Sequence, residues 1–221
     1  MFVFDYLTNI RWVFVTTKFL EIFFENCFKD MKIFEMIIND GDEGVYAISL
    51  VDRPAIESNW VHFKDEEPIQ FATVDEEQRI ILGAVLVPSK PIYRKDDKHG
   101  EYYVFTSKDT VRKAGEKFLH DSLNNKATIQ HEEEINGLRV VESWFKEGEH
   151  DKSMNFGLDV PDGTWMVSYR VDNEVIWNEY VKTGKVKGFS IEGFFSFSTP
   201  SEESKPDLIE ELEKVLKEEG A

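Results

Sequence analysis

The segment KGFSIEGFFSF, from Lys187 to Phe197, places one serine, Ser190, between Gly188 and Gly193 in a run that is otherwise mostly apolar and strand-like. Glycines on both sides let a ligand come close to the backbone and leave the serine hydroxyl uncrowded, as a nucleophile requires. The segment departs from the G-x-S-x-G nucleophile elbow, because its second glycine comes one residue late and no helical pattern follows. An α/β-hydrolase fold is therefore not expected, and a catalytic role for Ser190 requires a base from elsewhere in the chain.

The composition indicates one β-rich domain with appendages. With 221 residues, 41% of them hydrophobic and 14% aromatic, the chain can bury a sizeable core, and its 18 phenylalanines favour strand packing. The formal net charge of -17 argues against nucleic-acid binding, which requires clustered Lys and Arg. A single cysteine, Cys27, excludes an internal disulfide framework and fits a reducing cytoplasm.

Changes in composition divide the chain into four segments. Residues 1–30 are an aromatic leader whose charges interrupt every apolar run, so neither a membrane span nor a secretion signal is expected. A removable pro-segment, an amphipathic docking helix and an upstream start codon all remain open for this leader. Residues 31–75 are predicted to hold entry strands (KIFEMII and VYAISLV) and a linker, and residues 76–198 the main domain. Residues 199–221 are predicted to form an acidic amphipathic helix, either solvated or docked on a partner.

Within the main domain, the apolar pattern predicts strands and one long helix. That helix is expected from about Lys108 to Leu123, with a capping pattern at Thr106 and Asp109. A shorter helix is expected near residues 174–181. Strands are expected before Pro88 and near residues 101–105, 127–135, 138–145, 164–171 and 187–197.

Asn136-Gly137 is the strongest short hairpin signal in the chain, because this dipeptide suits the positive φ angles of a type I′ turn. With these two residues as the loop, His131 faces Glu142 on the core-facing side of the hairpin. Directly opposed side chains lie close enough for a carboxylate to reach an imidazole. The predicted register therefore gives a His131–Glu142 pair, which is either a catalytic dyad or a pair that only fixes the register.

Metal binding is the competing chemistry for His131. The sequence HEEE at 131–134 does not match H-E-x-x-H, and a strand sends alternate residues to opposite faces, so these side chains do not converge as zinc ligands must. Glu192 is predicted to point to the face opposite to Ser190, which makes it a poor third member. Neither a metal nor a cofactor is expected. The other histidines are expected to be surface residues: His62, His99, His120 and His150.

Several sequence pieces follow one another between Ile81 and Phe197: GAVLVPSKPIYR, EYYVFTSKDTVRKAGEKFL, TIQHE, RVVESW and a long stretch that ends in VKGFSIEG. In this order they resemble the phage procapsid (prohead) maturation serine proteases, in particular the XkdF-like branch. The resemblance implies an α+β, β-dominated fold similar to the herpesvirus assemblins, a closed and mainly antiparallel β-barrel wrapped by helices. It places the family's serine on Ser190, its histidine on His131 and its acidic member on Glu142.

The resemblance implies a serine endopeptidase in which His131 takes the proton of Ser190 and Glu142 orients the imidazole. Backbone N–H groups near Gly188 and Ile191 are the candidates for the oxyanion hole. The implied substrates lie inside the phage procapsid, in the bacterial host cytoplasm. They are the scaffold, extensions of the major capsid protein, and the protease itself, with a homo-oligomer as one option; nucleic acid and membrane are not expected partners.

Two readings without catalysis remain open. One is a procapsid assembly protein that binds scaffold on the same fold, with a purely structural His131–Glu142 pair. The other is a β-rich binding domain unrelated to phage, in which Ser190 and His131 do not meet.

Overall fold

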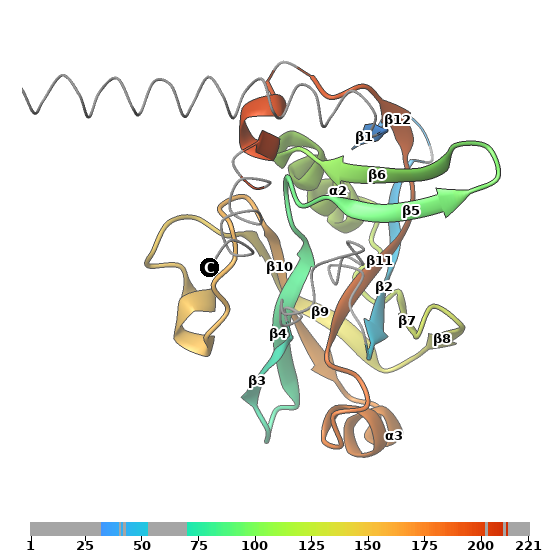
Figure 1. Ribbon diagram of the computed structural model, residues 1–221. Helices are drawn as coiled ribbons and strands as arrows, with labels where there is room; N and C mark the ends of the chain where they lie inside the picture. The colour runs from blue at the N-terminus through green and yellow to red at the C-terminus, as the bar shows by residue number, and fades with distance from the viewer. Residues whose placement is uncertain are drawn as a thin grey trace, which may run out of the picture.

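Three four-stranded sheets form the framework of the molecule (Figure 1). The computed structural model describes residues 32–39, 41, 43–52, 70–201, 203–209 and 211. The first sheet has the order β12 (Ser196–Ser198), β1 (Ile33–Ile37), β6 (Gly100–Thr106) and β5 (Ile92–Asp96). The second has the order β3 (Ala72–Asp75), β4 (Ile80–Leu86), β10 (Trp165–Val171) and β9 (Leu138–Phe145). The third has the order β11 (Gly188–Phe194), β2 (Gly44–Val51), β7 (Ala127–Ile129) and β8 (Glu133–Ile135).

Helix α2 (Lys108–His120) is the long helix that the sequence predicts. Its N-cap is Ser107 and not the predicted Thr106: the Ser107 Oγ accepts a hydrogen bond from the backbone N–H of Thr110 and so caps the first turn. A Cβ atom at Gly115 would lie 2.9 Å from Cζ of Phe145, so this glycine lets α2 approach the second sheet closely. The predicted apolar face of the helix is buried at Val111, Ala114 and Phe118.

The other helical segments are short. They are a 3-10 helix (Lys152–Phe156), helix α3 (Glu174–Ile176), the π-helical turn that continues it (Trp177–Val181), and a turn of helix at residues 205–209. Within the described parts of the chain, no helix has both the length and the apolar character to span a membrane.

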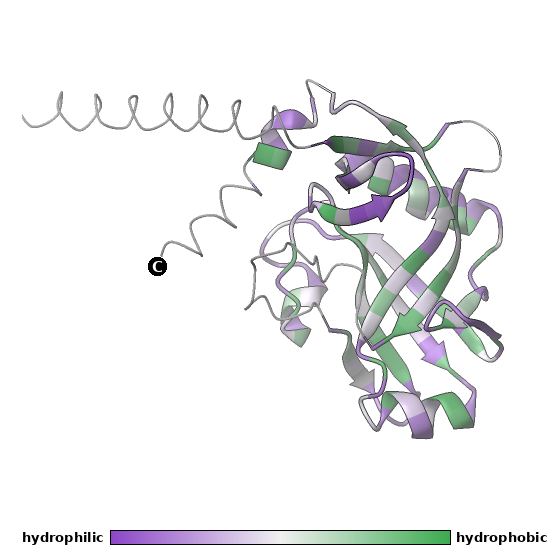
Figure 2. Ribbon diagram, turned by 45° about the vertical axis from the view of Figure 1, so that its right-hand side comes forward, coloured by the Kyte–Doolittle hydropathy of each residue, from purple (hydrophilic) through white to green (hydrophobic). Residues whose placement is uncertain are grey.

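The main core lies between α2 and the second and third sheets. Phe118 of α2 meets Trp165 edge to face, with ring centroids 5.4 Å apart. The rings of Tyr169 and Phe189 lie 5.5 Å apart, which ties β10 to β11. Figure 2 shows hydrophobic residues along the strands that surround this core. The apolar side chains of the strands are thus buried both between the sheets and against the helix.

The start of the C-terminal segment packs on the body of the molecule. Leu208 is only 4% exposed, and Asp207 forms a 3.0 Å ion pair with Lys108 at the start of α2. The Ser204 hydroxyl donates to Oε2 of Glu35, a buried carboxylate on β1, over 2.8 Å. This segment is therefore anchored at its beginning, whereas the leader of residues 1–30 and the tail beyond residue 211 lie outside the described residues.

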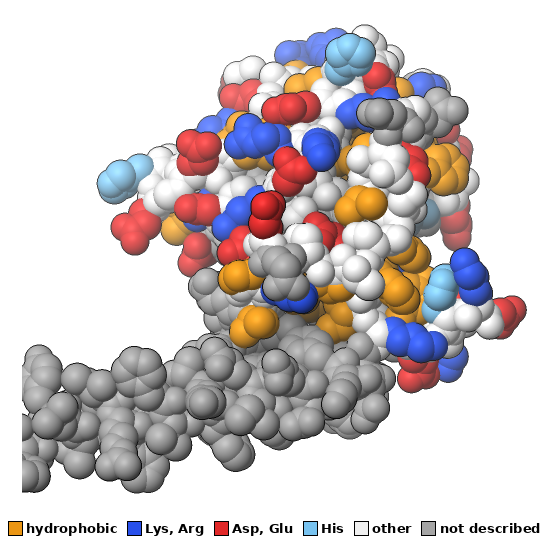
Figure 3. Space-filling model, turned by 90° about the horizontal axis from the view of Figure 1, so that it is seen from above, with side chains coloured by type: hydrophobic (Ala, Val, Ile, Leu, Met, Phe, Trp, Pro, Cys, Tyr) orange, Lys and Arg blue, Asp and Glu red, His pale blue; other side chains and the backbone are white. Residues whose placement is uncertain are grey.

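Charges of both signs are mixed over the face that Figure 3 shows. Lys and Arg side chains alternate there with Asp and Glu side chains, and none of the basic groups on this face gathers into a larger patch. Short ion pairs join side chains of opposite charge on α2, as between Lys113 and Asp109 at 2.8 Å.

The expected closed barrel is wrong. The fold is β-rich and mainly antiparallel as predicted, but in the described residues no sheet closes on itself. Strand β11 is an edge strand of the third sheet, and it passes beside β4 without a hydrogen-bonded ladder. The ring of Phe189 packs on Gly83 of β4, where an added Cβ would lie 3.1 Å from the ring. Side-chain packing takes the place of strand pairing at this junction, so the sheets stay separate.

The predicted hairpin register is also wrong. Ala127 pairs with Ile135 and Ile129 with Glu133, so the chain reverses within residues 130–132 and not at Asn136-Gly137. Strand β9 pairs with β10 of the second sheet. Gly137 does adopt a positive φ of 82°, but its carbonyl accepts hydrogen bonds from the N–H groups of Asp172 and Asn173 after β10. The Asn-Gly signal therefore marks the place where the chain leaves one sheet for another.

Candidate active site

Ser190 lies in the middle of β11, on the face turned away from the main core. It pairs directly with Ser49 of β2, and directly paired residues share a face of the sheet. Its neighbour Phe189 points the other way, into the core. Ser190 is only 3% exposed, yet it lines an open pocket.

Gly193, the second glycine of the segment, has a packing role. The ladder between β11 and β2 shifts register between Glu192 and Gly193. A Cβ atom at Gly193 would lie 2.6 Å from the carbonyl oxygen of Gly44, closer than a side chain tolerates. This glycine therefore permits the irregularity that ends the regular ladder two residues after Ser190.

His131 lies in a turn that its own local sequence does not favour. Gln130 and His131 have φ angles of 51° and 59°, and the N–H of Glu132 donates to the carbonyl of Ile129 over 3.0 Å. Positive φ at both central residues is the property of type I′ turns, which prefer Asn-Gly, and each such angle costs a side-chain-bearing residue roughly 1–2 kcal/mol. Contacts from elsewhere in the fold must therefore hold this turn in place.

Two contacts from β2 supply that support. The N–H of Gln130 donates to the carbonyl of Leu50 over 2.9 Å. The N–H of His131 donates to Oγ of Ser49, a completely buried hydroxyl, over 3.0 Å. Because Ser49 is the cross-strand partner of Ser190, the same residue links the turn to the strand that carries the serine.

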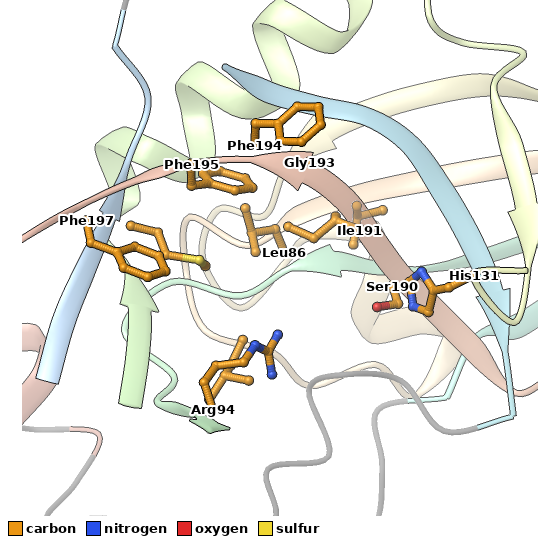
Figure 4. A pocket seen from close by; sticks show the side chains of 12 residues that line it. Leu86, Arg94, His131, Ser190, Ile191, Gly193, Phe194, Phe195 and Phe197 are labelled. Carbon is orange, nitrogen blue, oxygen red and sulfur yellow. The ribbon is translucent and has the colours of Figure 1, made fainter. Parts of the chain in front are cut away.

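Ser190 and His131 meet at one end of the same pocket, where Figure 4 shows the imidazole ring beside the serine side chain. The sequence predicts this meeting from positions that are far apart in the chain. No described residue forms a hydrogen bond with the Ser190 hydroxyl. Catalytic hydrogen bonds are often long or poorly aligned until a substrate is bound, so this geometry is compatible with a nucleophile and its base.

Glu192 is the carboxylate that contacts His131. Its Oε1 atom lies 3.2 Å from Nδ1 of His131 and also accepts a short hydrogen bond from Oγ1 of Thr128. Its side chain is 16% exposed, against 41% for the imidazole. The prediction that Glu192 points away from Ser190 is wrong, because residues two apart on a strand share a face. The two-residue spacing between Ser190 and Glu192 is visible in the sequence, and it indicates that both side chains lie on the same face of the strand.

Glu142 lies elsewhere, on β9 of the second sheet. Its Oε2 atom accepts a short hydrogen bond from Nζ of Lys152 and a 2.6 Å hydrogen bond from Oγ of Ser168. These two bonds, that from Lys152 first, hold the pKa of the Glu142 carboxyl below its ordinary value. The predicted contact between His131 and Glu142 is therefore absent, because the register that creates it does not form.

The two oxyanion candidates differ in their relation to the pocket. Ile191 follows the serine directly and lines the pocket, whereas Gly188 pairs with Val51 at the start of β11. Their role in binding an oxyanion stays a prediction.

Two of the remaining described histidines make local contacts, and His150 is exposed as predicted. Nδ1 of His99 lies 3.0 Å from Oδ2 of Asp96, and Nδ1 of His120 lies 3.0 Å from Oδ1 of Asp121. His62 lies outside the described residues. Among the residues that the structure covers, no three His, Cys, Asp or Glu side chains are grouped as a metal site.

The pocket beside Ser190 has a volume of about 430 Å³. It opens between β11, the end of β4 and the first sheet. Most of its lining is apolar, and one lining residue, Arg94 on β5, is cationic. The apolar residues that line it are Met36, Val85, Leu86, Ile92, Ile191, Phe194, Phe195 and Phe197.

The site lies inside a segment that matches a known protein family. Residues 68–197 match the family model described as "Putative phage serine protease XkdF". The chain belongs to this family. The matched segment contains Ser190, His131 and Glu192, which lie together, and also Glu142, which lies on another sheet. No curated protein and no solved structure gives a significant match, and the predicted relation to the assemblins stays a prediction.

Proposed function

We propose that this chain is a serine endopeptidase in which Ser190 is the nucleophile, His131 the general base and Glu192 the acidic third member. The observation that carries the proposal is the contact of His131 Nδ1 with Glu192 Oε1, at 3.2 Å, beside a serine that opens onto the same pocket. Membership of a phage serine protease family supports a serine nucleophile independently of this geometry.

The contact with Glu192 determines which nitrogen of His131 can act as the base. With Nδ1–H donating to the carboxylate, Nε2 is left to accept the proton of the Ser190 hydroxyl. The serine oxygen then attacks a peptide carbonyl, and the carbonyl carbon becomes tetrahedral with a negative oxygen. As the C–N bond breaks, the imidazolium returns the proton to the leaving amine, and a water molecule later hydrolyses the acyl-enzyme by the same route.

Glu192 has two tasks in this scheme. Its negative charge stabilises the imidazolium that forms when His131 takes the proton, and its position selects the imidazole tautomer. The hydrogen bond from Thr128 fixes the carboxylate, so the ring of His131 is oriented from two strands of the same sheet. The backbone N–H groups near Gly188 and Ile191 remain the candidates for binding the oxyanion.

The phage family also supports a biological role. We propose that the substrates are the scaffold, extensions of the major capsid protein and the protease itself, and that cleavage occurs inside a procapsid in the bacterial host cytoplasm. Self-cleavage would then end activity. Procapsids assembled with the Ser190→Ala variant are expected to contain uncut precursor chains.

A fluorophosphonate probe tests the chemistry directly, because it labels only an activated serine. We expect wild-type protein to be labelled, and Ser190→Ala and His131→Ala to lose the label. Ser198→Ala is a matched control, since the Ser198 hydroxyl bonds only to the carbonyl of the next residue among the described groups. A label that persists in Ser190→Ala would overturn the assignment, and an unlabelled wild-type protein that still joins procapsids would favour a non-catalytic assembly protein.

A further inference from the structure

The pocket beside Ser190 has walls from all three sheets, and Val85 and Leu86 are its contribution from β4 of the second. Ser190 and Ile191 come from the third sheet, and Met36 and Ile92 come from the first. The volume of about 430 Å³ exceeds what one small side chain fills, and most of the lining is apolar. A bound peptide would therefore place bulky apolar groups here.

Arg94 breaks the apolar character of this pocket. On β5 it pairs with Tyr102, and Ile92 pairs with Val104. Tyr102 and Val104 are buried, and residues two apart share a strand face, so Arg94 lies on the apolar side of the first sheet. Figure 4 shows its side chain entering the space that Ser190 also faces. Among the described residues that line the pocket, it is the one with a fixed positive charge.

Arg94 is itself exposed, at the edge of the apolar pocket. Its guanidinium has a planar set of donors that matches a carboxylate with two parallel hydrogen bonds, and this interaction strengthens when a bound peptide excludes water from it. The chain as a whole has a net charge of -17, so long-range attraction would not draw acidic peptides to it. Preference for an acidic residue would have to come from a local contact such as that with Arg94.

We infer that this pocket binds substrate segments that combine a bulky apolar side chain with an acidic side chain, and that Arg94 recognises the acidic one. The inference rests on the proposed protease activity and adds its substrate class. Arg94 acts as a specificity residue in this scheme, because it binds the substrate away from the bond that is cut.

A charge-swap experiment with peptide substrates tests this inference. Internally quenched peptides with blocked ends, randomised in the positions around the cut bond, are cleaved by the wild-type chain and by Arg94→Glu. Wild-type kcat/KM should be roughly 10–100-fold higher for Glu than for Gln at one position, the range expected of a charged hydrogen bond. Arg94→Glu should lose this preference and favour Lys there. Lys95→Glu, a change at the exposed neighbour that pairs with Glu101 over 2.9 Å, should keep the wild-type preference.

The outcomes separate this inference from the proposed function. Two results overturn the inference alone, provided that Ser190 is labelled. One is cleavage that does not depend on acidic residues, and the other is an acidic preference that Arg94→Glu leaves intact. A wild-type protein that is not labelled overturns both the inference and the proposed function. A different role for Arg94 is to prevent the edge strand β5 from pairing with other molecules, as inward-pointing charges on edge strands do. In that case Arg94→Ala would self-associate and its peptide preference would be unchanged. This result would also reject the inference.

Discussion

The exchange of Glu192 for Gln, compared with the same exchange at Glu142, tests the assignment of the acidic residue. Glu192→Gln keeps the shape of the side chain and an oxygen that can accept from both Thr128 and His131. What it removes is the negative charge behind the imidazole. Glu142→Gln makes the same chemical change at the carboxylate that the sequence favours, on a different sheet.

The expected loss follows from the geometry of the contact. At 3.2 Å the Nδ1–Oε1 distance is at the long end of the hydrogen-bond range, so the lower values for a charged bond apply. At that lower end a hydrogen bond to a charged group is worth about 1.5 kcal/mol, roughly twice a neutral one, so the difference here is about 0.75 kcal/mol. Because the imidazolium exists only after proton transfer, this loss falls on kcat, by about three- to fourfold, with little change in KM.

Steady-state cleavage of one peptide by the three proteins gives the answer. We expect Glu192→Gln to lower kcat about three- to fourfold and Glu142→Gln to leave it near the wild-type value, with circular dichroism showing that both variants are folded. A larger loss in Glu142→Gln than in Glu192→Gln would refute the reasoning, because the charge that matters would then lie on β9.

Three further outcomes follow from the contacts of the turn and of Glu142. Ser49→Ala removes the acceptor of the His131 N–H, so the free energy of unfolding measured in urea should fall by about 1–3 kcal/mol. The variant should also have a lower kcat, and an unchanged kcat would exclude a positioning role for Ser49. Gln130→Gly should raise stability by about 0.5–1 kcal/mol, because glycine adopts the φ of 51° freely, and a decrease would show that the turn is not strained. Since bonds from Lys152 and Ser168 lower the pKa of Glu142, its contribution to stability is present above the ordinary glutamate range and is lost as the pH falls through the lowered pKa. Thermal unfolding of Glu142→Gln across acidic pH should accordingly depend less steeply on pH than that of the wild type.

Local patterns in the sequence predict individual elements well. The alternation in KIFEMII and VYAISLV corresponds to β1 and β2, and the apolar spacing after Ser107 corresponds to α2. Burial of one face creates the pattern of α2, whereas β2 is buried at every position except Tyr46. Such local apolar patterns can be read without knowing the rest of the fold. The position of Ser190 in a strand is predictable for the same reason.

The failures concern pairing between elements. Asn136-Gly137 does lie at a bend of the chain, but such a signal does not specify which strand the next segment will join, and β9 pairs with β10 of another sheet. The turn that presents His131 has no glycine, asparagine or aspartate, so no local signal reveals it. Its backbone is held by hydrogen bonds to Ser49 and Leu50, about 80 residues earlier in the chain. Closure of a barrel likewise depends on contacts between distant strands, here between Phe189 and Gly83.

The three proposed catalytic residues are not held with equal firmness. Ser190 and Glu192 lie two residues apart on β11, and the ladder with β2 fixes the distance between their backbones. His131 stands on a two-residue turn that adopts unfavourable φ angles and depends on two hydrogen bonds to β2. Any adjustment that brings the imidazole into line with the serine during turnover will therefore take place in this turn, since moving β11 would break the ladder. Substitutions at Gln130 and Ser49 should consequently change kcat without touching the substrate, whereas the geometry between Ser190 and Glu192 should tolerate them.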